Sequence, residues 1–255
     1  MDYKDIIDWH KKYGTSKDDI IKRVGYQNIL ENVVIAPWWE HNIFDEFSDR
    51  IEEVGKNVYN VYGKGFEFSF IEVKNIGAPS IVEYVLPLGL TKCEKLLFIG
   101  SAGTLDKSIK IGDLVVPVFS YNGVGVCRYF NDNLEDDFEN KYYPNNQLNN
   151  DLINAIKKIG YKYHNVINYS VDTIFAQFAH IEHIVELGAK TIEMETSTMF
   201  RCADMLNIAS AALFCVSDST LKNKSLYSGR TEEDKKIKYY IREKIIPRIV
   251  IETFK

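Results

Sequence analysis

The sequence predicts an α/β protein in three layers (α/β/α), with a largely parallel or mixed sheet between two layers of helices. Short apolar runs of strand length alternate along the chain with longer segments whose apolar residues recur at helical spacing. No internal repeat is visible, and the 255 residues suit one large α/β domain or two small ones. Strands that alternate with helices are typical of such layered architectures.

Residues 1–30 are expected to form a helical N-terminal extension to a main domain at residues 31–255. The apolar residues of this extension recur at amphipathic spacing. The break at Gly14–Asp19 combines a glycine with residues that favour a helix N-cap, which divides the extension into two helices. The extension is expected to pack on the main domain or on a partner subunit, and the sequence leaves both open.

The first half of the main domain is expected to supply a buried strand, a helix, a hairpin and a second helix. The strand is Asn32–Ala36, a short and mainly apolar run. Residues 43–54 carry apolar side chains at helical spacing and predict an amphipathic helix. Residues 57–73 alternate on either side of a glycine-rich turn and predict a hairpin. Pro79 suits the first turn of a helix at Ile81–Leu90.

The second half is expected to continue the alternation of strands and helices, interrupted by one long polar and aromatic excursion. In chain order we expect a strand at Lys95–Ile99, a glycine loop at 100–105, a turn and strand at Ile109–Pro117, the excursion at 121–150, a helix at Leu152–Ile159, a strand at Val166–Phe175 that runs into a loop, a helix at His180–Leu187, a strand at Ala209–Phe214, a polar loop at 222–233, and a helix from Lys235 onward.

Composition excludes several classes of protein. The chain is 45% apolar, enough for a sizeable core, and its net charge of −5 without a long basic run argues against nucleic-acid binding. No apolar segment is long enough to span a bilayer, and the charged start lacks the apolar stretch of a signal peptide, so a cytoplasmic protein without membrane partners is expected. The four cysteines are far apart in the sequence and are expected to be small buried residues. Neither they nor the five histidines have the spacing of metal ligands, so no metal site is expected.

Three short stretches combine polar chemistry with the end of a predicted strand. Glu193 and Glu195 flank Met194 directly before a helix that we expect to start near Thr196. They are either acids that complement the helix dipole, the more common case, or ligand-binding carboxylates at the end of a strand. Residues 100–103 (Gly-Ser-Ala-Gly) let a ligand approach the backbone closely, with the hydroxyl of Ser101 beside it.

The third stretch is Cys215–Ser219, where Asp218 follows a buried strand and is either a general acid or a cap of the next segment, with equal weight from the local sequence. A further candidate is Trp38-Trp39 before Glu40. Two adjacent tryptophans at a strand end either pack in the core or form the stacking wall of a pocket with Glu40 at its mouth.

Taken in order, Gly100–Gly103, Glu193–Glu195 and Val216–Asp218 resemble the motifs of the nucleoside phosphorylase superfamily, in the branch that contains purine nucleoside phosphorylase, uridine phosphorylase and methylthioadenosine/S-adenosylhomocysteine nucleosidase. The resemblance covers roughly residues 32 to 250. It implies a central mixed sheet that is partly closed into a barrel, and cleavage of the N-glycosidic bond of a nucleoside, of purine type given the expected acid. It also implies a small-molecule nucleoside ligand, no cofactor and a homo-oligomer.

The same resemblance implies roles for individual residues. Glu195 would hold the ribose hydroxyls with Met194 packed against the sugar, and Glu193 would be structural or at the rim of the site. Asp218 would protonate or hydrogen-bond the leaving purine at N7. The remaining implied ligand contacts are Ser101 and Gly103 near the nucleophile, Phe175 or Ile174 on the base, and Trp38 on the wall.

The sequence departs from the phosphorylases where these hold phosphate with arginines. Phe98 lies two residues before Gly100, the first strand leads into Pro37-Trp38-Trp39-Glu40, and the hairpin offers Tyr62, with Lys64 as only a partial substitute. Glu40 falls about where the nucleosidases carry an acidic residue that activates water, although it also suits a helix cap. We therefore favour hydrolysis. The alternatives are a phosphate-dependent phosphorylase, with phosphate as co-substrate, and a non-catalytic nucleoside-binding module.

Overall fold

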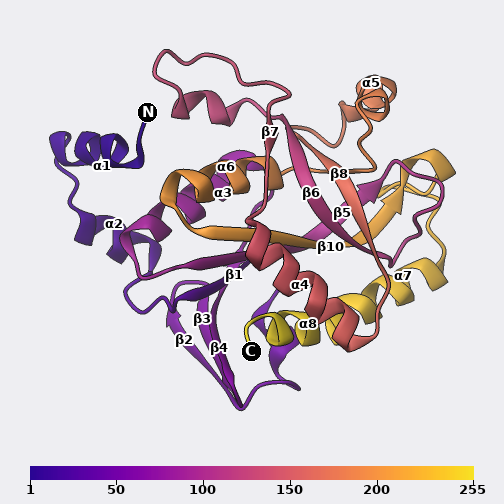
Figure 1. The fold of residues 1–255 in the computed structure, drawn as a ribbon, viewed down its shortest axis with the longest axis horizontal. Coiled ribbons are helices and arrows are strands. Elements are labelled where there is room, and N and C mark those ends of the chain that lie inside the picture. The colour runs from indigo at the N-terminus through magenta and orange to yellow at the C-terminus, as the bar shows by residue number, and fades with distance from the viewer.

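A computed structural model describes the whole chain, residues 1–255, and its centre is a mixed sheet of ten strands that closes on itself. Strand β5 pairs with β9 on one side and with β10 on the other, and β6 and β8 complete the ring, so five strands form a closed barrel (Figure 1). The barrel strands are β5 (Lys95–Thr104), β6 (Leu114–Gly123), β8 (Tyr163–Val171), β9 (Thr191–Glu193) and β10 (Ala209–Ser219). The expected mixed, partly barrel-like sheet is confirmed.

The sheet continues beyond the barrel through β1, which pairs in parallel with both β5 and β4. From β4 the chain folds back through two antiparallel pairings to β3 and β2, as expected for the hairpin. A short strand pairs with the end of β6. The bounds are β1 (Asn32–Pro37), β2 (Arg50–Gly55), β3 (Val58–Gly63), β4 (Phe66–Val73) and β7 (Lys141–Tyr142).

Helices cover both faces of the sheet, which confirms the three layers (Figure 1). Helices α3 and α6 lie on one face, with α1 and α2 beyond them, and α4 and α8 cover the other. The bounds are α1 (Tyr3–Lys12), α2 (Lys17–Val24), α3 (Ala78–Val85), α4 (Asn146–Ile159), α5 (Ile181–Glu186), α6 (Thr196–Leu206), α7 (Glu232–Tyr240) and α8 (Ile246–Thr253). No helix in the structure combines the length and apolarity that crossing a bilayer requires.

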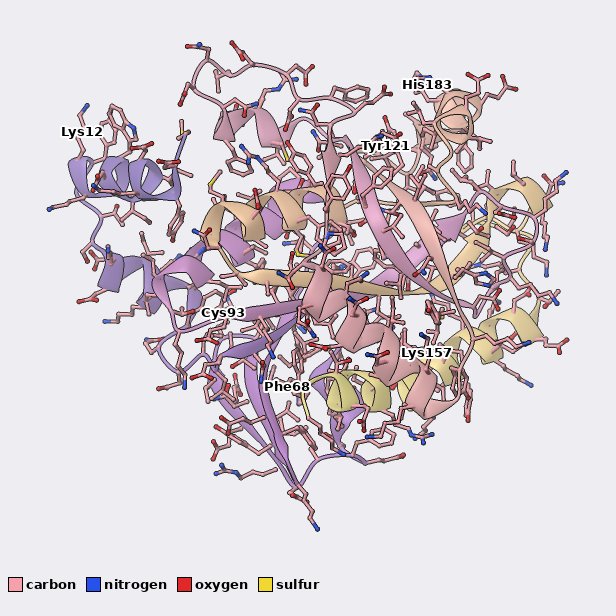
Figure 2. All side chains as sticks on the ribbon, viewed as in Figure 1. Lys12, Phe68, Cys93, Tyr121, Lys157 and His183 are labelled. Carbon is pink, nitrogen blue, oxygen red and sulfur yellow. The ribbon has the colours of Figure 1, made fainter.

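Two large apolar cores lie on opposite faces of the sheet because successive side chains of a strand point to opposite sides. Along β5, Leu96 and Phe98 join the core under α3 and α6, whereas Leu97 and Ile99 join the core under α4 and α8. Figure 2 shows Phe68 inside the molecule, with Lys12 and His183 at its periphery. The four cysteines are free and buried, as predicted.

The helix predicted for residues 43–54 is wrong. Only His41–Phe44 forms a helical turn, and Arg50–Gly55 is strand β2 at the edge of the sheet. Its backbone pairs with β3, with Arg50 opposite Tyr62. The apolar spacing that suggested a helix arises because the turn and the strand each bury residues in the same core, and the hydrogen bonds of the sheet decide the conformation.

The glycine loop predicted at 100–105 is also wrong, because β5 continues to Thr104. Likewise β10 runs on to Ser219, five residues past the predicted end. The two strands pair in parallel along their whole length, which keeps their polar carboxyl ends extended. The predicted helix at Ile81–Leu90 divides into α3 and a 3₁₀ turn (Leu86–Leu90).

The C-terminal helical run contains one π-helical turn, η6 (Ile241–Ile245), between α7 and α8. The residue responsible is Pro247, which lacks an N–H group and whose ring, in a regular helix, would meet the carbonyl of Glu243. The wider π turn lies directly before this proline. Such turns occur often at functional sites, and Arg242 of this turn lines the cavity described below.

Candidate active site

A cavity of about 220 Å³ lies at the carboxyl ends of the parallel strands β1, β5 and β10. This edge of the sheet is where open α/β sheets bind ligands. Of the ten residues that the sequence nominated, the cavity lining includes eight and leaves out Glu40 and Phe175. The eight are Trp38, Ser101, Gly103, Ile174, Glu193, Met194, Glu195 and Asp218.

Glu193 has both carboxylate oxygens occupied by the fold itself. Oε1 accepts hydrogen bonds from Asn168 at 2.8 Å and Ser170 at 2.5 Å, both on β8. Oε2 accepts from the backbone N–H groups of Glu195 (2.7 Å) and Thr196 (2.8 Å) and from the Thr196 hydroxyl. The side chain is buried and joins β8 to the start of α6, so its geometry fits the structural reading of this residue.

The Glu195 carboxyl group lies close to that of Glu193 but has different backbone partners. Its Oε1 accepts the N–H of Gly77, at the start of α3, at 2.5 Å, and no basic side chain pairs with it. Burial and the nearby charge of Glu193 raise the pKa of Glu195 to about 8, which the Gly77 N–H partly offsets. The carboxyl group is therefore held at the cavity without a cation, so it is free to accept or donate hydrogen bonds to a ligand.

Asp218 reaches the cavity because β10 carries a bulge. The register between β10 and β5 shifts between Val216 and Asp218, which places Asp218 beside Gly103. The Ser217 hydroxyl donates to Asp218 Oδ1 at 2.5 Å. Burial raises the pKa of Asp218, against the lowering effects of Ser217, Arg230 and Lys238.

Gly103 is needed for this arrangement. A Cβ atom at its position would come within 2.8 Å of Asp218 Oδ2 and 3.3 Å of Ile192 Cγ2. A side chain there would have to displace the carboxylate. The glycine therefore lets β10 bring its acid against β5.

Of the two adjacent tryptophans, Trp39 packs in the core and Trp38 is exposed. Trp39 is 3% exposed and packs in the core under α4 and α8. Trp38 is 62% exposed, adopts a φ of 59°, and anchors its indole N–H on the carbonyl of Lys74 at 2.9 Å. Both residues line the cavity.

Glu40, the first of the two nominated residues outside the cavity lining, is exposed. It lies at the N-terminal boundary of the turn His41–Phe44, where its side chain makes no capping hydrogen bond. Burial is the main cause that raises the pKa of Tyr59, and a hydrogen bond to Glu72 is the main cause that raises the pKa of Lys74. The charge of Glu40 adds to both shifts.

Phe175 is the second nominated residue outside the lining. Its side chain is 85% exposed. The neighbouring Ile174 lines the cavity, and the contact of either residue with the base stays a prediction.

The cavity also contains two cations that the sequence reading missed, Lys238 on α7 and Arg242 on η6. They lie four residues apart on the polar side of the C-terminal helix. Helical periodicity identifies that side as polar but does not say which end of the sheet it meets. No group of three or more His, Cys, Asp or Glu side chains is arranged to hold a metal ion.

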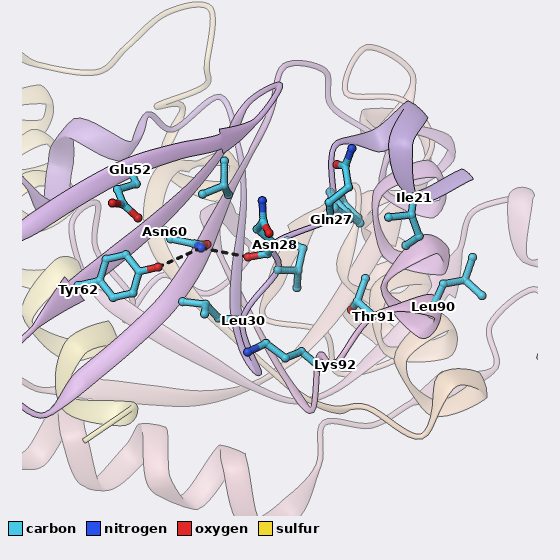
Figure 3. A pocket seen from close by; sticks show the side chains of 13 residues that line it. Ile21, Gln27, Asn28, Leu30, Glu52, Asn60, Tyr62, Leu90, Thr91 and Lys92 are labelled. Carbon is cyan, nitrogen blue, oxygen red and sulfur yellow. Dashed lines mark hydrogen bonds between the residues drawn. The ribbon is translucent and has the colours of Figure 1, made fainter. Parts of the chain in front are cut away.

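A second hollow of about 610 Å³ lies at the opposite, amino-terminal end of β1 (Figure 3). At its centre Asn60 donates to the Asn28 carbonyl at 3.0 Å and to the Tyr62 hydroxyl at 3.2 Å, and accepts from Ser69. These buried polar groups already pair with one another, so the hollow offers a ligand no unpaired buried group. The cavity at the carboxyl ends of the strands is the better candidate for chemistry.

Two buried carboxyl groups at the carboxyl ends of a mixed sheet, next to a five-stranded barrel, define an α/β enzyme of the phosphorylase type. A sequence model described as "Phosphorylase superfamily" matches residues 48–240. The chain belongs to this superfamily, whose members cleave glycosidic bonds. No curated protein sequence matches the chain. The predicted boundary near residue 31 stays a prediction.

Solved structures share the fold at low sequence identity. Uridine phosphorylase from Vibrio fischeri aligns with a TM-score of 0.75 and 20% identity, over 91% of this chain and 94% of its own. Purine nucleoside phosphorylase from Toxoplasma gondii, in complex with immucillin-H, aligns with a TM-score of 0.72 and 18% identity, over 88% and 92%. The 5′-methylthioadenosine/S-adenosyl homocysteine nucleosidase of Campylobacter jejuni aligns with 0.69 and 19%, over 88% and 98%.

Proposed function

We propose that the chain hydrolyses the N-glycosidic bond of a purine-type nucleoside. One observation carries the proposal: Glu195 and Asp218 face one cavity from different elements, and burial raises the pKa of both. Perturbed carboxyl groups that converge on a cleft are the usual mark of acid and base chemistry. Cleavage at an oxocarbenium-like sugar needs a proton for the leaving base and a grip on the sugar, and the two groups supply these separately.

Asp218 acts as the general acid in this proposal. A raised pKa helps it to keep its proton near neutral pH and to deliver that proton to the base, at N7 of a purine. The bond between C1′ and the base nitrogen breaks, and its electron pair goes to the base. The oxygen of water bonds to C1′, and the proton that this water releases restores the acid form of Asp218 through solvent. The products are free base and free sugar.

Glu195 holds the sugar. Its carboxyl oxygens reach the cavity from the start of α6, and the N–H of Gly77 orients Oε1. Met194 also lines the cavity and supplies an apolar surface beside the sugar. Gln177 and Ile174 also line the cavity, and in this proposal they contact the base.

Water is the proposed nucleophile because Phe98 lies two residues before Gly100, where the phosphorylases are expected to carry an arginine. Phe98 is buried and packs its ring edge-on against Phe214, with ring centres 5.8 Å apart. Pro37 and Trp38 also line the cavity, and the Arg242 guanidinium donates to the Trp38 carbonyl at 3.4 Å. At position 98 itself, phosphate is without a bidentate donor. The role of Glu40 as the base that activates water stays a prediction.

Phosphorolysis is the second candidate, and a specific observation favours it. Lys238 and Arg242 line the same cavity and carry the positive charge that a phosphate nucleophile needs. The decisive experiment is a turnover panel of purine and pyrimidine nucleosides with and without inorganic phosphate. Release of free base and free sugar without phosphate supports the proposal, whereas strict dependence on phosphate with formation of a sugar 1-phosphate refutes hydrolysis. The homo-oligomeric state and cytoplasmic location stay predictions.

A further inference from the structure

The turn that follows β1 holds Trp38 in a backbone conformation that bulky residues rarely adopt. Its φ of 59° lies in the left-handed region, which a side chain with a Cβ atom disfavours. The ring is 62% exposed, so burial of the ring in the core does not impose this conformation. Such outliers persist where the surrounding structure holds them, and they gather at ligand sites. Trp38 also lines the cavity of the candidate active site.

The end of β4 fixes both the backbone and the ring of Trp38. The backbone N–H of Trp38 donates to the Val73 carbonyl at 2.9 Å, and its indole N–H donates to the Lys74 carbonyl at 2.9 Å. Its own carbonyl accepts from Arg242 at 3.4 Å. Since the polar edge of the indole is already paired, the faces of the ring are what remains for a ligand.

Glu72, also on β4, holds the other end of the same turn. Its side chain is 3% exposed, and Oε1 accepts the backbone N–H of His41 at 2.9 Å and lies 2.7 Å from His41 Nδ1. Oε2 accepts a hydrogen bond from the Lys74 ammonium group. The His41 ring stacks on Tyr59, with ring centres 3.7 Å apart. Glu72 therefore connects the end of the turn to Lys74, whose carbonyl anchors the ring of Trp38.

The carboxylate of Glu72 is fully committed to these contacts. Burial by itself would raise the pKa of Glu72, but the hydrogen bonds from Lys74 and His41 outweigh burial, so the pKa is lowered and the group is ionised. Glu72 is not part of the cavity lining. Three donors depend on this one buried carboxylate, so its loss would leave all three without their acceptor.

We propose that Glu72 is a positioning residue that fixes the ring of Trp38 as a stacking wall for the substrate. The inference rests on the proposed function, because the nucleoside is the ligand that this wall contacts. An indole face packs on a flat carbon surface, and a nucleoside offers two of these, its base and the C–H face of its sugar. Glu72 touches neither the substrate nor the reacting atoms. It acts through Lys74 and His41, which hold the two ends of the turn.

Fluorescence anisotropy decay tests the positioning role without any turnover. The variant Trp9→Phe removes the second exposed tryptophan, and Trp39 is buried in the core, so fast local motion in this background reports on Trp38. Glu72→Gln keeps the volume but offers one acceptor oxygen to three donors. We expect the amplitude of the fast motion to rise in Glu72→Gln and to stay unchanged in Glu67→Gln, the matched control at an exposed position on the same strand.

The conservative variant Glu72→Asp guards against misfolding. It keeps the negative charge, so its fast motion should lie between those of the Trp9→Phe background and Glu72→Gln. Motion that is unchanged in Glu72→Gln overturns the proposal, as does an equal rise in Glu67→Gln.

Steady-state kinetics on the best nucleoside of the turnover panel tests the wall. Trp38→Ala should raise KM about tenfold or more with little change in kcat, because stacking stabilises the bound substrate and the transition state alike. Glu72→Gln should raise KM about threefold or more in the wild type but have no further effect in the Trp38→Ala background, because its influence passes through the ring. An unchanged KM in Trp38→Ala, or additive effects of the two substitutions, overturns the proposal.

Inhibition by free adenine and by free ribose distinguishes the two surfaces. If the base lies on the wall, Trp38→Ala weakens inhibition by adenine about tenfold and leaves that by ribose unchanged, and if the sugar lies there the reverse holds. Inhibition by both that is unaffected by Trp38→Ala overturns the stacking wall.

Failure of the proposed function has a different signature. If no nucleoside is cleaved while the Trp38 ring moves faster in Glu72→Gln, the proposed function is refuted and the positioning role stands. Cleavage by the wild type with Trp38 motion unaffected by Glu72→Gln does the reverse.

Discussion

Replacing Glu195 by glutamine should make the protein more stable at neutral and alkaline pH. The raised pKa of about 8, against 4.5 for an ordinary glutamate, means that the folded protein holds a proton over this range that the unfolded chain has lost. Unfolding then releases a proton, so the stability that this group contributes is complete below pH 4.5 and falls as the pH rises toward 8. A glutamine side chain does not titrate, so the variant escapes this loss.

The size of the effect follows from the pKa shift. Each pKa unit corresponds to about 1.36 kcal/mol. A pH of 7 lies roughly 2.5 units above the ordinary glutamate pKa of 4.5, so the free energy of unfolding of the wild type is lower at pH 7 than at acid pH by an amount on the order of 3 kcal/mol. The amide oxygen of the substituted glutamine can still accept the N–H of Gly77, so the fold at that point is retained.

Urea denaturation of the wild type and Glu195→Gln at pH 5, 7 and 8.5 measures the difference. We expect nearly equal free energies of unfolding at pH 5 and a gap that widens in favour of the variant with pH. Glu83→Gln, at an exposed position on α3, is the matched control and should follow the wild type. A gap between wild type and Glu195→Gln that stays constant across these pH values would refute the reasoning, because it would show that the Glu195 carboxyl group ionises normally.

Four further substitutions test the site. Asp218→Asn should lower kcat by about 10²–10⁴-fold, because it removes the proton donor. In the wild type, activity should fall as rising pH deprotonates Asp218, at a pH above the usual range for an aspartate because its pKa is raised, and the variant should lack this fall. Unchanged turnover in the variant would remove Asp218 from the mechanism. Gly103→Ala should lower kcat about tenfold or more, because its Cβ would lie 2.8 Å from Asp218 Oδ2, whereas Gly125→Ala, with no contact under 3.7 Å, should not; equal effects would contradict the steric argument. Glu193→Ala should cost about 3 kcal/mol or more in urea denaturation, because it leaves buried donors of Asn168, Ser170 and Thr196 without an acceptor; a cost below about 1 kcal/mol would argue against the structural role. Glu40→Gln should lower turnover less than about tenfold, because Glu40 is exposed and lies outside the cavity lining, and a loss of about 10²–10⁴-fold would instead be the mark of the predicted base.

A strand or helix could be predicted from the sequence wherever the local spacing of apolar residues matches the conformation that the segment adopts in the fold. Strand β1, the end of helix α4 at its cap Gly160, and the start of α6 at Thr196 follow directly from local apolar runs and cap residues, whereas α4 begins at Asn146, six residues before its predicted start. Residues 43–54 show the opposite case. Their spacing fits a helix, and only the pairing partner β3 makes part of them a strand. A sequence window does not contain that partner.

The site could be predicted to the same extent. Residues at the ends of strands, such as Ser101 and Asp218, are close in space because parallel strands end at one edge of the sheet. The cavity lining also includes Lys238 and Arg242, which come from a helix packed on that edge. No local pattern distinguishes these two cations from others on the polar side of the helix.

By itself the sequence determined the layered α/β class, the strand ends that bear acids and small residues, and the resemblance to the phosphorylase superfamily. These features depend on local periodicity and short motifs. The tertiary structure alone decided that the carboxylate oxygens of Glu193 are hydrogen-bonded within the protein while Glu195 faces the cavity. It also decided that a bulge in β10 brings Asp218 against Gly103. It also decided that two cations meet the acids across one cavity. Each of these contacts depends on which segment, distant in the sequence, lies beside the residue, and the closed barrel determines that arrangement.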